Sequence, residues 1–406
     1  MQRMDQIGQL LNRGVEKIYP SKEALEKLLR SGKKLTLYQG FDPTGTQLHI
    51  GHMIGLRKLR QWQDLGHHVI FLIGDGTGQA GDPSGKSKAR NKFFTQQELR
   101  ANATDYVKQA GRIVRFEGEN PVEIRFNGDW LNKLSLPDIL DLAGHFTLQQ
   151  LSERDFFQER IKRGEAVNLR EFLYPLLQGY DSVAMSVDLE LGGSDQTFNM
   201  LCGRTLVSAM QGREKFVMTT PLLTDSQGRK IGKTEGNVIG LNDQSQDLFG
   251  KIMSLSDDVI SKGLEYLTNV SQEEIDKIQK ELTAGANPMA AKKRLAFEIT
   301  KELHSEAAAK DAQEHFERVV QQGENPQQIP VAQLAAQVFS FGTSITSLLV
   351  AAALTPSSSE AKRLITQGAV ELDGQVLTDP VQVVKPKEGQ ILKVGKRRIV
   401  RLAKGA

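Results

Sequence analysis

Two histidines, His49 and His52, lie three residues apart in the segment LHIGHM, directly after the turn-like segment GFDPTGTQ. Residues three apart share one face of a helix, so this pair could hold a metal ion together. A catalytic zinc site usually has a third protein ligand, and the segment lacks the glutamate of an H-E-x-x-H motif. A phosphate site is the alternative, because the first turn of a helix offers unpaired N–H groups and partial positive charge. In that interpretation Gly51 lets a flat base approach the backbone.

Two further segments carry cations beside glycine. AGDPSGKS, residues 80–87, ends like a phosphate-binding P-loop, but Ala80 stands where that pattern requires glycine, and Pro83 opposes an immediate helix. We therefore expect a basic loop there. In GRKIGKTEGN, Lys230 and Lys233 flank an Ile-Gly step, and such a pair alone is usually a solvated surface turn.

Short apolar runs that end in glycine or aspartate must position these segments. They occur in KKLTLYQGF, HHVIFLIGDGTG, NPVEIRFNGDWL, MSVDLELGGSDQ and EKFVMTTPLL, and they alternate with helix-like stretches such as 53–65 and 198–210. This alternation is typical of βαβ units and predicts an α/β fold with a Rossmann-like parallel sheet. Ligands bind outside the carboxyl ends of strands in such sheets, which is where GFDP, GDGTG and GGSDQ fall. We expect these loops to converge.

The chain changes character after about residue 240, where helical periodicity continues without strand-like runs. A stretch rich in Pro, Gly and Gln then indicates a linker before a short terminal unit. We therefore expect a catalytic α/β domain (1–240), a helical domain (241–324), a linker (325–342) and a small α+β domain (343–406).

The composition is that of an ordinary globular protein, with 39% hydrophobic and 25% charged residues. No apolar run is long enough to cross a bilayer, and the N-terminus lacks the apolar core of a secretory signal. Cys202 is the single cysteine, so no internal disulfide can form, and a reducing, cytoplasmic setting is expected. Because the net charge is only +3, nucleic-acid binding must depend on where the charges lie.

The segments HIGH, KIGKT, GFDPT, GDPSGK and GGSDQ together resemble the class I aminoacyl-tRNA synthetases, and YQGFDPT with LYPLLQGYDS resembles their bacterial-type tyrosyl-tRNA synthetases. SSSEAKRLITQGAVELDGQ is similar to the S4 RNA-binding domain, so the resemblance covers nearly the whole chain. It implies that L-tyrosine is activated with ATP to tyrosyl-adenylate and pyrophosphate, and that tyrosyl is then transferred to the 3′ end of tRNA(Tyr). It also implies a homodimer, a helical domain near the anticodon, and Mg²⁺ that arrives with ATP. No dedicated protein site for the metal is evident in the sequence.

The resemblance assigns roles to individual residues. Those expected to handle the phosphates and carry catalysis are Thr44, His49, His52, Lys86, Arg90, Lys230, Lys233 and Thr234. Those expected around ATP are Gly40, Asp42, His49, Gly51, His52, Gly193, Asp195, Gln196 and Lys233. Those expected around tyrosine are Tyr38 and Asp181 at the phenol, Tyr174, Gln178 and Asp82 at the ammonium, and Thr77 and Asn127 nearby. The loop reads KIGKT where many class I enzymes carry KMSKS, and both lysines are retained.

The last segment, KVGKRRIVRLAKG, is strongly basic. A solvated tail is one interpretation. Its alternation favours a strand with charges exposed on one side, which with Lys362 and Arg363 on the preceding helix predicts a patch for the phosphate backbone of tRNA.

Two other functions remain open. A tryptophanyl-tRNA synthetase shares the fold and the motifs, but Tyr38, Asp181 and the S4-like terminus oppose it. A non-catalytic RNA-binding protein derived from a synthetase is opposed by the intact HIGH segment and by both lysines of KIGKT.

Overall fold

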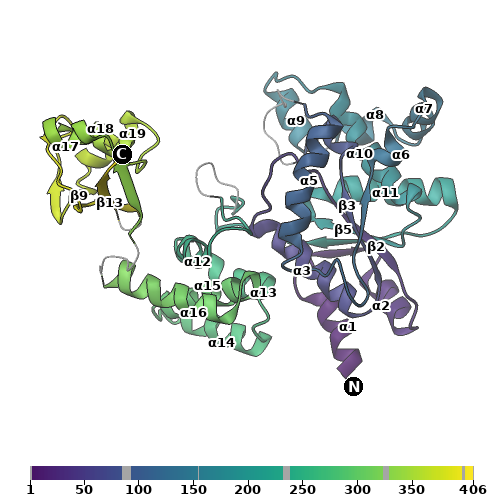
Figure 1. The fold of residues 1–406 in the computed structure, drawn as a ribbon. Coiled ribbons are helices and arrows are strands. Elements are labelled where there is room, and N and C mark those ends of the chain that lie inside the picture. Colours follow the sequence, from purple (N-terminus) through teal and green to yellow (C-terminus); the bar gives the residue numbers. More distant parts are fainter. Residues whose placement is uncertain are drawn as a thin grey trace. The chain divides into compact units, whose positions relative to one another are not determined.

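A computed structural model describes residues 2–84, 93–153, 155–231, 238–322, 329–395 and 398–405. The chain forms two compact units, Met1–Ala309 and Lys310–Ala406 (Figure 1). The first contains a six-stranded sheet and the second a five-stranded one. The predicted α/β class with a small α+β unit at the end of the chain is thereby confirmed.

The six-stranded sheet of the first unit has the order β1-β6-β5-β2-β3-β4. Strands β2 to β6 pair in parallel, whereas β1 pairs antiparallel with β6 at the edge. The chain builds outward from β2 to β3 and β4, and then returns to the other side of β2 as β5 and β6. This reversal between β2 and β5 opens a ligand crevice at the carboxyl ends of the strands. The strands are β1 (Lys17–Tyr19), β2 (Thr36–Phe41), β3 (His68–Ile73), β4 (Glu123–Phe126), β5 (Leu189–Gly193) and β6 (Phe216–Thr220).

Helices connect these strands and cover the sheet. α3 joins β2 to β3, α11 joins β5 to β6, and α10 packs along α11. Figure 1 shows α10 and α11 beside the labelled strands. The helices up to β6 are α1 (Gln2–Asn12), α2 (Lys22–Arg30), α3 (Ile50–Asp64), α4 (Thr77–Ala80), α5 (Gln96–Ala110), α6 (Gly128–Leu131), α7 (Leu136–Gly144), α8 (Leu148–Ser152), α9 (Asp155–Lys162), α10 (Leu169–Ala184) and α11 (Thr197–Gln211).

Local sequence explains where several helices begin. Thr95 accepts a hydrogen bond from the backbone N–H of Glu98, and the Glu98 carboxylate accepts one in return from the N–H of Thr95. Ser135 and Asp138 form the same capping box at the start of α7. Each box satisfies two N–H groups that a helix N-terminus otherwise leaves unpaired.

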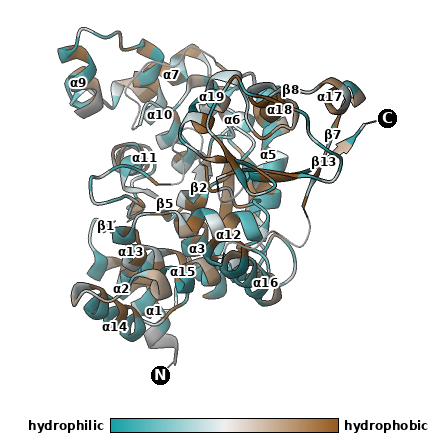
Figure 2. Ribbon diagram, turned by 90° about the vertical axis from the view of Figure 1, so that its left-hand side faces the viewer, coloured by the Kyte–Doolittle hydropathy of each residue, from teal (hydrophilic) through white to brown (hydrophobic). Residues whose placement is uncertain are grey.

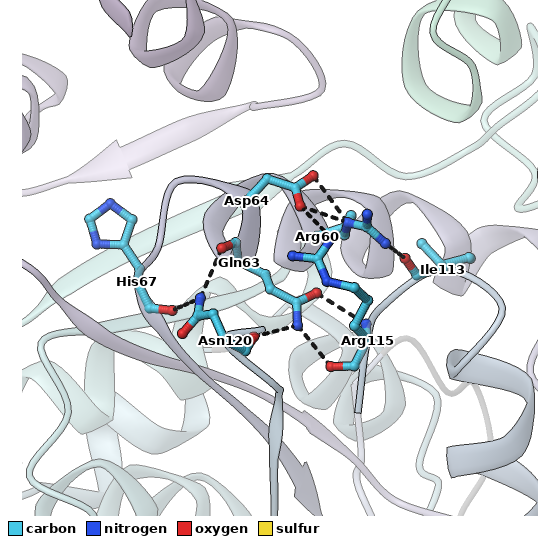
Figure 3. A network of polar contacts seen from close by, with 7 residues as sticks. All are labelled: Arg60, Gln63, Asp64, His67, Ile113, Arg115 and Asn120. Carbon is cyan, nitrogen blue, oxygen red and sulfur yellow. Dashed lines mark hydrogen bonds and ion pairs between the residues drawn. The ribbon is translucent and has the colours of Figure 1, made fainter. Parts of the chain in front are cut away.

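The C-terminal end of α3 is tied to the loop that leads into β4 (Figure 3). The buried Gln63 amide donates to the carbonyls of Arg115 and Asn120, at 2.7 and 2.8 Å, and accepts from the Arg115 N–H. Asn120 donates to the carbonyls of Gln63 and His67. Asp64 accepts from Arg60 and Arg115 at the solvent side of the network. These bonds hold the outer end of α3 rigidly against the sheet.

The middle of α3 is tied to the N-terminal helix and to the helices that follow the sheet. Buried Lys58 donates to the carbonyls of Leu10 and Arg13, and Arg57 forms an ion pair with Glu302 and donates to Asn269. The following helices are α12 (Ser245–Met253), α13 (Ile260–Leu267), α14 (Gln272–Thr283) and α15 (Met289–Leu303). Their region, predicted as a separate helical domain, lies in the same compact unit as the sheet, and α13 packs on α3.

α16 (Glu306–Phe316) crosses the boundary between the units and continues as a π-helical turn, Glu317–Gln321. The second unit then forms a sheet in the order β10-β9-β12-β13-β7 and a short pair, β11-β8. Its helices pack on a core that includes Ile345, Leu348, Ile365, Leu392 and Leu402. The elements are β7 (Val331–Leu334), α17 (Ala336–Phe341), β8 (Thr343–Ser344), α18 (Ile345–Ala351), α19 (Ser358–Thr366), β9 (Val370–Leu372), β10 (Gln375–Leu377), β11 (Val383–Val384), β12 (Ile391–Val394) and β13 (Arg398–Lys404).

Two features of the second unit differ from expectation. β7 and α17 come from the range assigned to a linker, and β7 pairs in parallel with β13. The basic C-terminal segment forms two antiparallel strands, β12 and β13, rather than one, because Gly395 adopts φ +59° and turns the chain. The four-part division of the chain stays a prediction.

The core follows the hydropathy of the sequence. In Figure 2 many helices carry both colours, as expected for helices with one face on the core. β6 is buried throughout, and β3 is buried after His68. In the part of the chain that the structure describes, no helix combines the length and the apolar character needed to cross a membrane.

Candidate active site

His49 and His52 lie at the start of α3, at the carboxyl end of the sheet where β2 ends. His49 is the residue before the first helical turn, and its Nδ1 accepts from the N–H of Gly51 at 3.1 Å. The Nδ1 of His52 accepts from the backbone N–H of His49 at 3.0 Å. Because Nδ1 accepts in both rings, the proton of each neutral imidazole is on Nε2. Each ring can therefore donate to an oxygen through a different atom from the one that holds it in place.

Gly51 lies beneath the His49 ring and beside the KIGKT segment. A Cβ at this position would be 3.0 Å from both Cε1 and Nδ1 of His49, and 3.8 Å from the carbonyl oxygen of Ile231. A side chain here would push the His49 ring out of its hydrogen bond. The absence of a side chain at Gly51 therefore allows the His49 ring and the backbone of Ile231 to lie close to the first turn of α3.

The first lysine of KIGKT reaches the GGSDQ loop. The ammonium of Lys230 donates to the carboxylate of Asp195 at 2.7 Å, and the backbone of Ile231 bonds to Leu223. Asp195 follows β5, and a Cβ on Gly193 would lie 2.7 Å from its carboxylate. The structure thus brings HIGH, GGSDQ and the first residues of KIGKT together. Lys86, Arg90, Lys233 and Thr234, which the sequence also assigns to the phosphates, lie outside the described residues.

Asp42 joins the set expected around ATP to the set expected around tyrosine. Its carboxylate accepts from the Thr77 hydroxyl at 2.7 Å and from the Tyr174 hydroxyl at 2.9 Å. The N–H of Thr44 bonds back to the carbonyl of Asp42, which shapes the turn after β2. Gly40, the residue before Phe41 in β2, packs near Leu72. Asp42, a member of the ATP set, therefore contacts two members of the tyrosine set directly.

Tyr38 and Asp181, the residues expected at the phenol, lie inside the first unit. Both are buried, with 1% of each residue exposed. The Tyr38 hydroxyl is 2.9 Å from the hydroxyl of Ser182. The Asp181 carboxylate accepts from Asn127 at 3.0 Å and from the indole N–H of Trp130 at 2.8 Å. A buried hydroxyl and a buried carboxylate on two different elements are groups that could hydrogen-bond a phenol O–H.

A chain of amides forms the other end of the tyrosine set. The amide of Asn199 donates to Gln178 at 3.0 Å and to Gln196 at 2.9 Å, and Gln196 donates to Asp82 at 2.9 Å. Asp82 follows β3 in the loop before the GKS segment, whereas Gln178 lies on α10. Acceptor oxygens of Gln178, Gln196 and Asp82 are therefore linked in one hydrogen-bonded chain, and oxygens of this kind can accept from an ammonium.

Burial shifts the pKa of the ionisable groups at the phenol end. It raises the pKa of Asp181 well above the ordinary value, against the opposing effect of the bonds from Asn127 and Trp130. It also raises the pKa of Tyr38, and the nearby carboxylates of Glu190 and Asp181 add to this shift. For Tyr174, burial and Asp42 raise the pKa together. Both tyrosines therefore keep their protons and serve as neutral hydrogen-bonding groups.

Three residues that the sequence did not single out complete these contacts: Trp130, Ser182 and Asn199. Trp130 follows β4 within the noted segment NGDWL, and Asn199 lies three residues after Gln196, so position near a strand end was a usable signal for both. Ser182 is adjacent to Asp181 but reaches Tyr38, which lies 144 residues earlier in the chain. Ser182 of α10 meets Tyr38 of β2 only in the folded chain, in which β2 pairs with β5.

The expected magnesium was tested against the side chains at hand. In the described ranges, no group of three or more His, Cys, Asp or Glu side chains is arranged to hold a metal ion. Asp195, which follows β5, is paired with Lys230 of the KIGKT segment. Magnesium that arrives with ATP stays a prediction.

Comparison with known proteins identifies the class to which this fold and site belong. The family model of class I tRNA synthetases (W and Y) matches residues 30–321, and the model of the S4 domain matches residues 347–389. The chain belongs to this family of class I tRNA synthetases.

Individual relatives are more specific. The chain is 40% identical to the tyrosine–tRNA ligase of Thermotoga maritima over 398 residues, which cover 98% of this chain and 97% of that protein. It is 41% identical to the tyrosine–tRNA ligase of Dehalococcoides mccartyi over 401 residues, or 98% of each chain.

Solved structures agree on the fold. The C-terminally truncated mitochondrial tyrosyl-tRNA synthetase of Coccidioides posadasii matches with a TM-score of 0.61 and 26% identity, covering 76% of this chain and 91% of that one. The corresponding Aspergillus nidulans structure matches with a TM-score of 0.65 and 24% identity, covering 77% and 93%. At such identities the second likeness concerns the fold alone.

Proposed function

We propose that this chain is a tyrosine–tRNA ligase. It activates L-tyrosine with ATP to tyrosyl-adenylate and pyrophosphate, and it transfers the tyrosyl group to the 3′ end of tRNA(Tyr). The observation that carries this proposal is the buried polar network between β2, α10 and the loops that follow β3 and β5. We assign the phenol end of the substrate to Tyr38 and Asp181 and its ammonium end to Gln178 and Asp82.

The first reaction is an in-line attack of the tyrosine carboxylate on the α-phosphorus of ATP. The new oxygen–phosphorus bond forms as the bond to the β-phosphate breaks, and pyrophosphate leaves with the added charge. No protein nucleophile is needed, so catalysis consists of positioning and of stabilising charge on the phosphates. In the second reaction a hydroxyl of the terminal tRNA ribose attacks the tyrosyl carbonyl, and AMP leaves.

The phosphate groups are handled from two sides. Thr44 and the Nε2–H groups of His49 and His52 approach from the start of α3, where the helix N-terminus adds positive potential. Lys230 approaches with the KIGKT segment, and we assign Lys86, Arg90, Lys233 and Thr234 to the same task by resemblance. Magnesium, bound to the ATP phosphates, would neutralise part of their charge.

Substrate choice follows from the phenol end of the pocket. Phenylalanine would leave the Tyr38 hydroxyl and the Asp181 carboxylate without their partner in a buried site, and unpaired buried polar groups are costly. The indole N–H of tryptophan can only donate a hydrogen bond, whereas a phenol hydroxyl can both donate and accept, so the phenol makes fuller use of a hydroxyl beside a carboxylate. The tyrosine assignment is thus favoured by the same two side chains.

For tRNA, the second unit offers a basic face. Lys362 and Arg363 on α19 and Arg401 and Lys404 on β13 are exposed. They suit the phosphate backbone, whose neutralisation makes binding depend on salt. The cytoplasmic setting expected from the sequence stays a prediction.

A homodimer is proposed from exposed apolar side chains in a single stretch of the chain. Leu136, Leu140, Leu148, Ile161 and Leu169 are between 51% and 74% exposed. Such a concentration is unusual on a monomer and suits a second copy of the chain. Leu140→Glu should shift the protein from dimer to monomer in sedimentation at micromolar concentration, and a mass unchanged by this substitution would contradict the proposed surface.

The function is tested by amino-acid-dependent exchange of pyrophosphate into ATP. Purified protein with magnesium should catalyse the exchange with tyrosine, and far more slowly with tryptophan or phenylalanine. Activity with tryptophan alone would instead support the alternative synthetase. Absence of exchange with every amino acid, in a folded protein, would support the non-catalytic alternative.

A further inference from the structure

Two buried charges, Glu190 and Lys215, lie beneath the tyrosine pocket. Glu190 is 1% exposed and Lys215 is fully buried, and they form an ion pair. Lys215 also donates to the carbonyl of Met200 at 3.2 Å. Glu190 lies on β5 in register with Tyr38 of β2, so both side chains leave the sheet on the same face. Neither residue has a role in the function proposed above.

The Glu190 carboxylate contacts both ends of the pocket. Its Oε1 accepts from the amide Nε2 of Gln178 at 2.9 Å. Its Oε2 accepts from the Ser182 hydroxyl at 3.3 Å, and that hydroxyl is the partner of Tyr38. Glu190 is thus one bond from the ammonium-binding side chain and two bonds from the phenol-binding hydroxyl.

A carboxylate with no proton can only accept hydrogen bonds. It therefore takes the NH₂ group of Gln178, which turns the amide oxygen of that residue to the opposite side. There the oxygen accepts from Asn199, which also donates to Gln196 beside Asp82. An amide carbonyl has a second lone pair, so this oxygen can also accept from an ammonium. A reversed Gln178 would point its own N–H groups at the positive charge.

Lys215 holds the Glu190 carboxylate in place through their ion pair. Burial lowers the pKa of the Lys215 ammonium, and the adjacent carboxylate acts in the opposite direction. Gly203 leaves room for this cation. A Cβ on Gly203 would lie 2.5 Å from the Lys215 Nζ and 3.3 Å from Glu190 Oε2, so a side chain at position 203 would collide with the ion pair. A buried ion pair is often no more stabilising than a well-packed apolar pair, so its presence here calls for a reason other than stability.

We propose that Glu190, held by Lys215, is a positioning residue that fixes the Gln178 amide with its oxygen toward the substrate ammonium. This inference rests on the proposed tyrosine site. It gives the pair a role in distinguishing amino acids from analogues that lack the amino group.

The test compares the binding of L-tyrosine with that of 3-(4-hydroxyphenyl)propionate, which lacks only the ammonium, by calorimetry on the full chain. In Glu190→Gln, the remaining oxygen of residue 190 stays with Lys215, so its NH₂ faces Gln178 and reverses that amide. Tyrosine should then bind about tenfold more weakly or worse, since a hydrogen bond to a charged group is lost. Affinity for the propionate should stay within about twofold, because the analogue makes no use of that bond.

A second variant tests orientation rather than charge. In Glu190→Gln/Lys215→Met the oxygen of residue 190 loses its ion-pair partner, whereas the Ser182 hydroxyl still contacts that side. Because a hydroxyl can also accept from an NH₂ group, the amide of residue 190 can turn its oxygen to Gln178 and accept its NH₂ again. This variant should recover most of the preference for tyrosine over the propionate. If the single variant is too unstable to bind either ligand, the double variant decides, and a folded double variant without that preference overturns the proposal.

Glu171→Gln supplies the matched control. It makes the same change in another buried carboxylate of the first unit, which pairs with fully buried Arg160 and does not contact Gln178. The ratio of the two dissociation constants should stay at the wild-type value in this control. Equal weakening of both ligands in Glu190→Gln, or no change in either, would overturn the positioning role. Failure of the wild-type chain to bind tyrosine would instead refute the proposed function itself.

Discussion

At the scale of single residues, the phenol end of the pocket depends on hydroxyls and carboxylates that have been removed from water. Tyr38 has Ser182 as a neighbour within hydrogen-bonding distance, and Asp181 is held by Asn127 and Trp130. Each group is oriented before a substrate arrives. Preorganisation of this kind lowers the cost of binding, since the side chains need not be ordered at that moment.

Tyr38→Phe removes one hydroxyl from this end and leaves the ring in place. We expect the preference for tyrosine over phenylalanine, measured as the ratio of kcat/KM in pyrophosphate exchange, to fall about tenfold, the effect of one buried hydrogen bond. The activity with phenylalanine itself should change little. A preference that stays the same would show that Tyr38 does not contact the phenol.

The sequence revealed these residues unevenly. His49, His52, Asp195 and the lysines lie in short motifs whose order along the chain is informative. Ser182 and Asn199 lie in no such motif, because a serine beside an aspartate or an asparagine in a helix occurs widely. The position of Asn199 shortly after β5 was a weaker signal, whereas the contact of Ser182 with Tyr38 arises only from the fold.

At the scale of elements, α3 links the HIGH segment to the rest of the first unit. Its first turn carries His49 and His52, and its centre is fixed to α1 and α15 through Lys58 and Arg57. The Gln63 network in Figure 3 then fixes the far end. One helix therefore connects the helical region to the two histidines.

Lys58 makes the stability of this arrangement depend on pH. Burial, together with Arg57 and Arg13, lowers its pKa to about 7. In the unfolded chain the amine keeps its proton up to the ordinary value of 10.5, so between these values the unfolded state binds more protons. The free energy of unfolding should therefore rise with pH in this range, by at most about 1.4 kcal/mol per pH unit.

Lys58→Met removes this titration. Urea unfolding between about pH 7 and 10 should give a flatter stability curve for Lys58→Met than for the wild type. The exposed Lys108→Met serves as the control and should follow the wild-type curve. Parallel curves for the wild type and Lys58→Met would contradict the lowered pKa.

The elements that sequence predicted well were those with a strong pattern. The parallel strands are buried runs of apolar residues, and α11 and α15 have clear helical spacing. β1 was missed because three residues at a sheet edge have no pattern of their own. β7 and α17 were missed because the glutamine- and proline-rich stretch before them indicated a linker.

At the scale of the whole molecule, each unit has its own core, and the chemistry is confined to the first. The catalytic loops gather around one sheet, whereas the S4 unit is organised around residues such as Leu348 and Leu402. This separation predicts that the two partial activities can be separated as well.

Deleting all residues after Pro330 removes β7 to β13 and leaves the first unit intact. Tyrosine-dependent exchange should stay within about twofold of the full chain, and charging of tRNA should fall. The remaining charging should depend less on salt, because fewer phosphate contacts are made. Equal charging by both proteins over a range of salt would refute a tRNA role for the S4 unit.

The edge strand β1 also bears on how this protein is made. Thr219 donates from its hydroxyl to the carbonyl of Lys17, 202 residues earlier, and the two strands pair over Lys17 to Tyr19. During synthesis the N-terminal segment therefore waits for its partner until more than half of the chain has left the ribosome. Until then the segment of β1 has no strand to pair with, and an unpaired strand segment is open to wrong pairing with neighbouring chains.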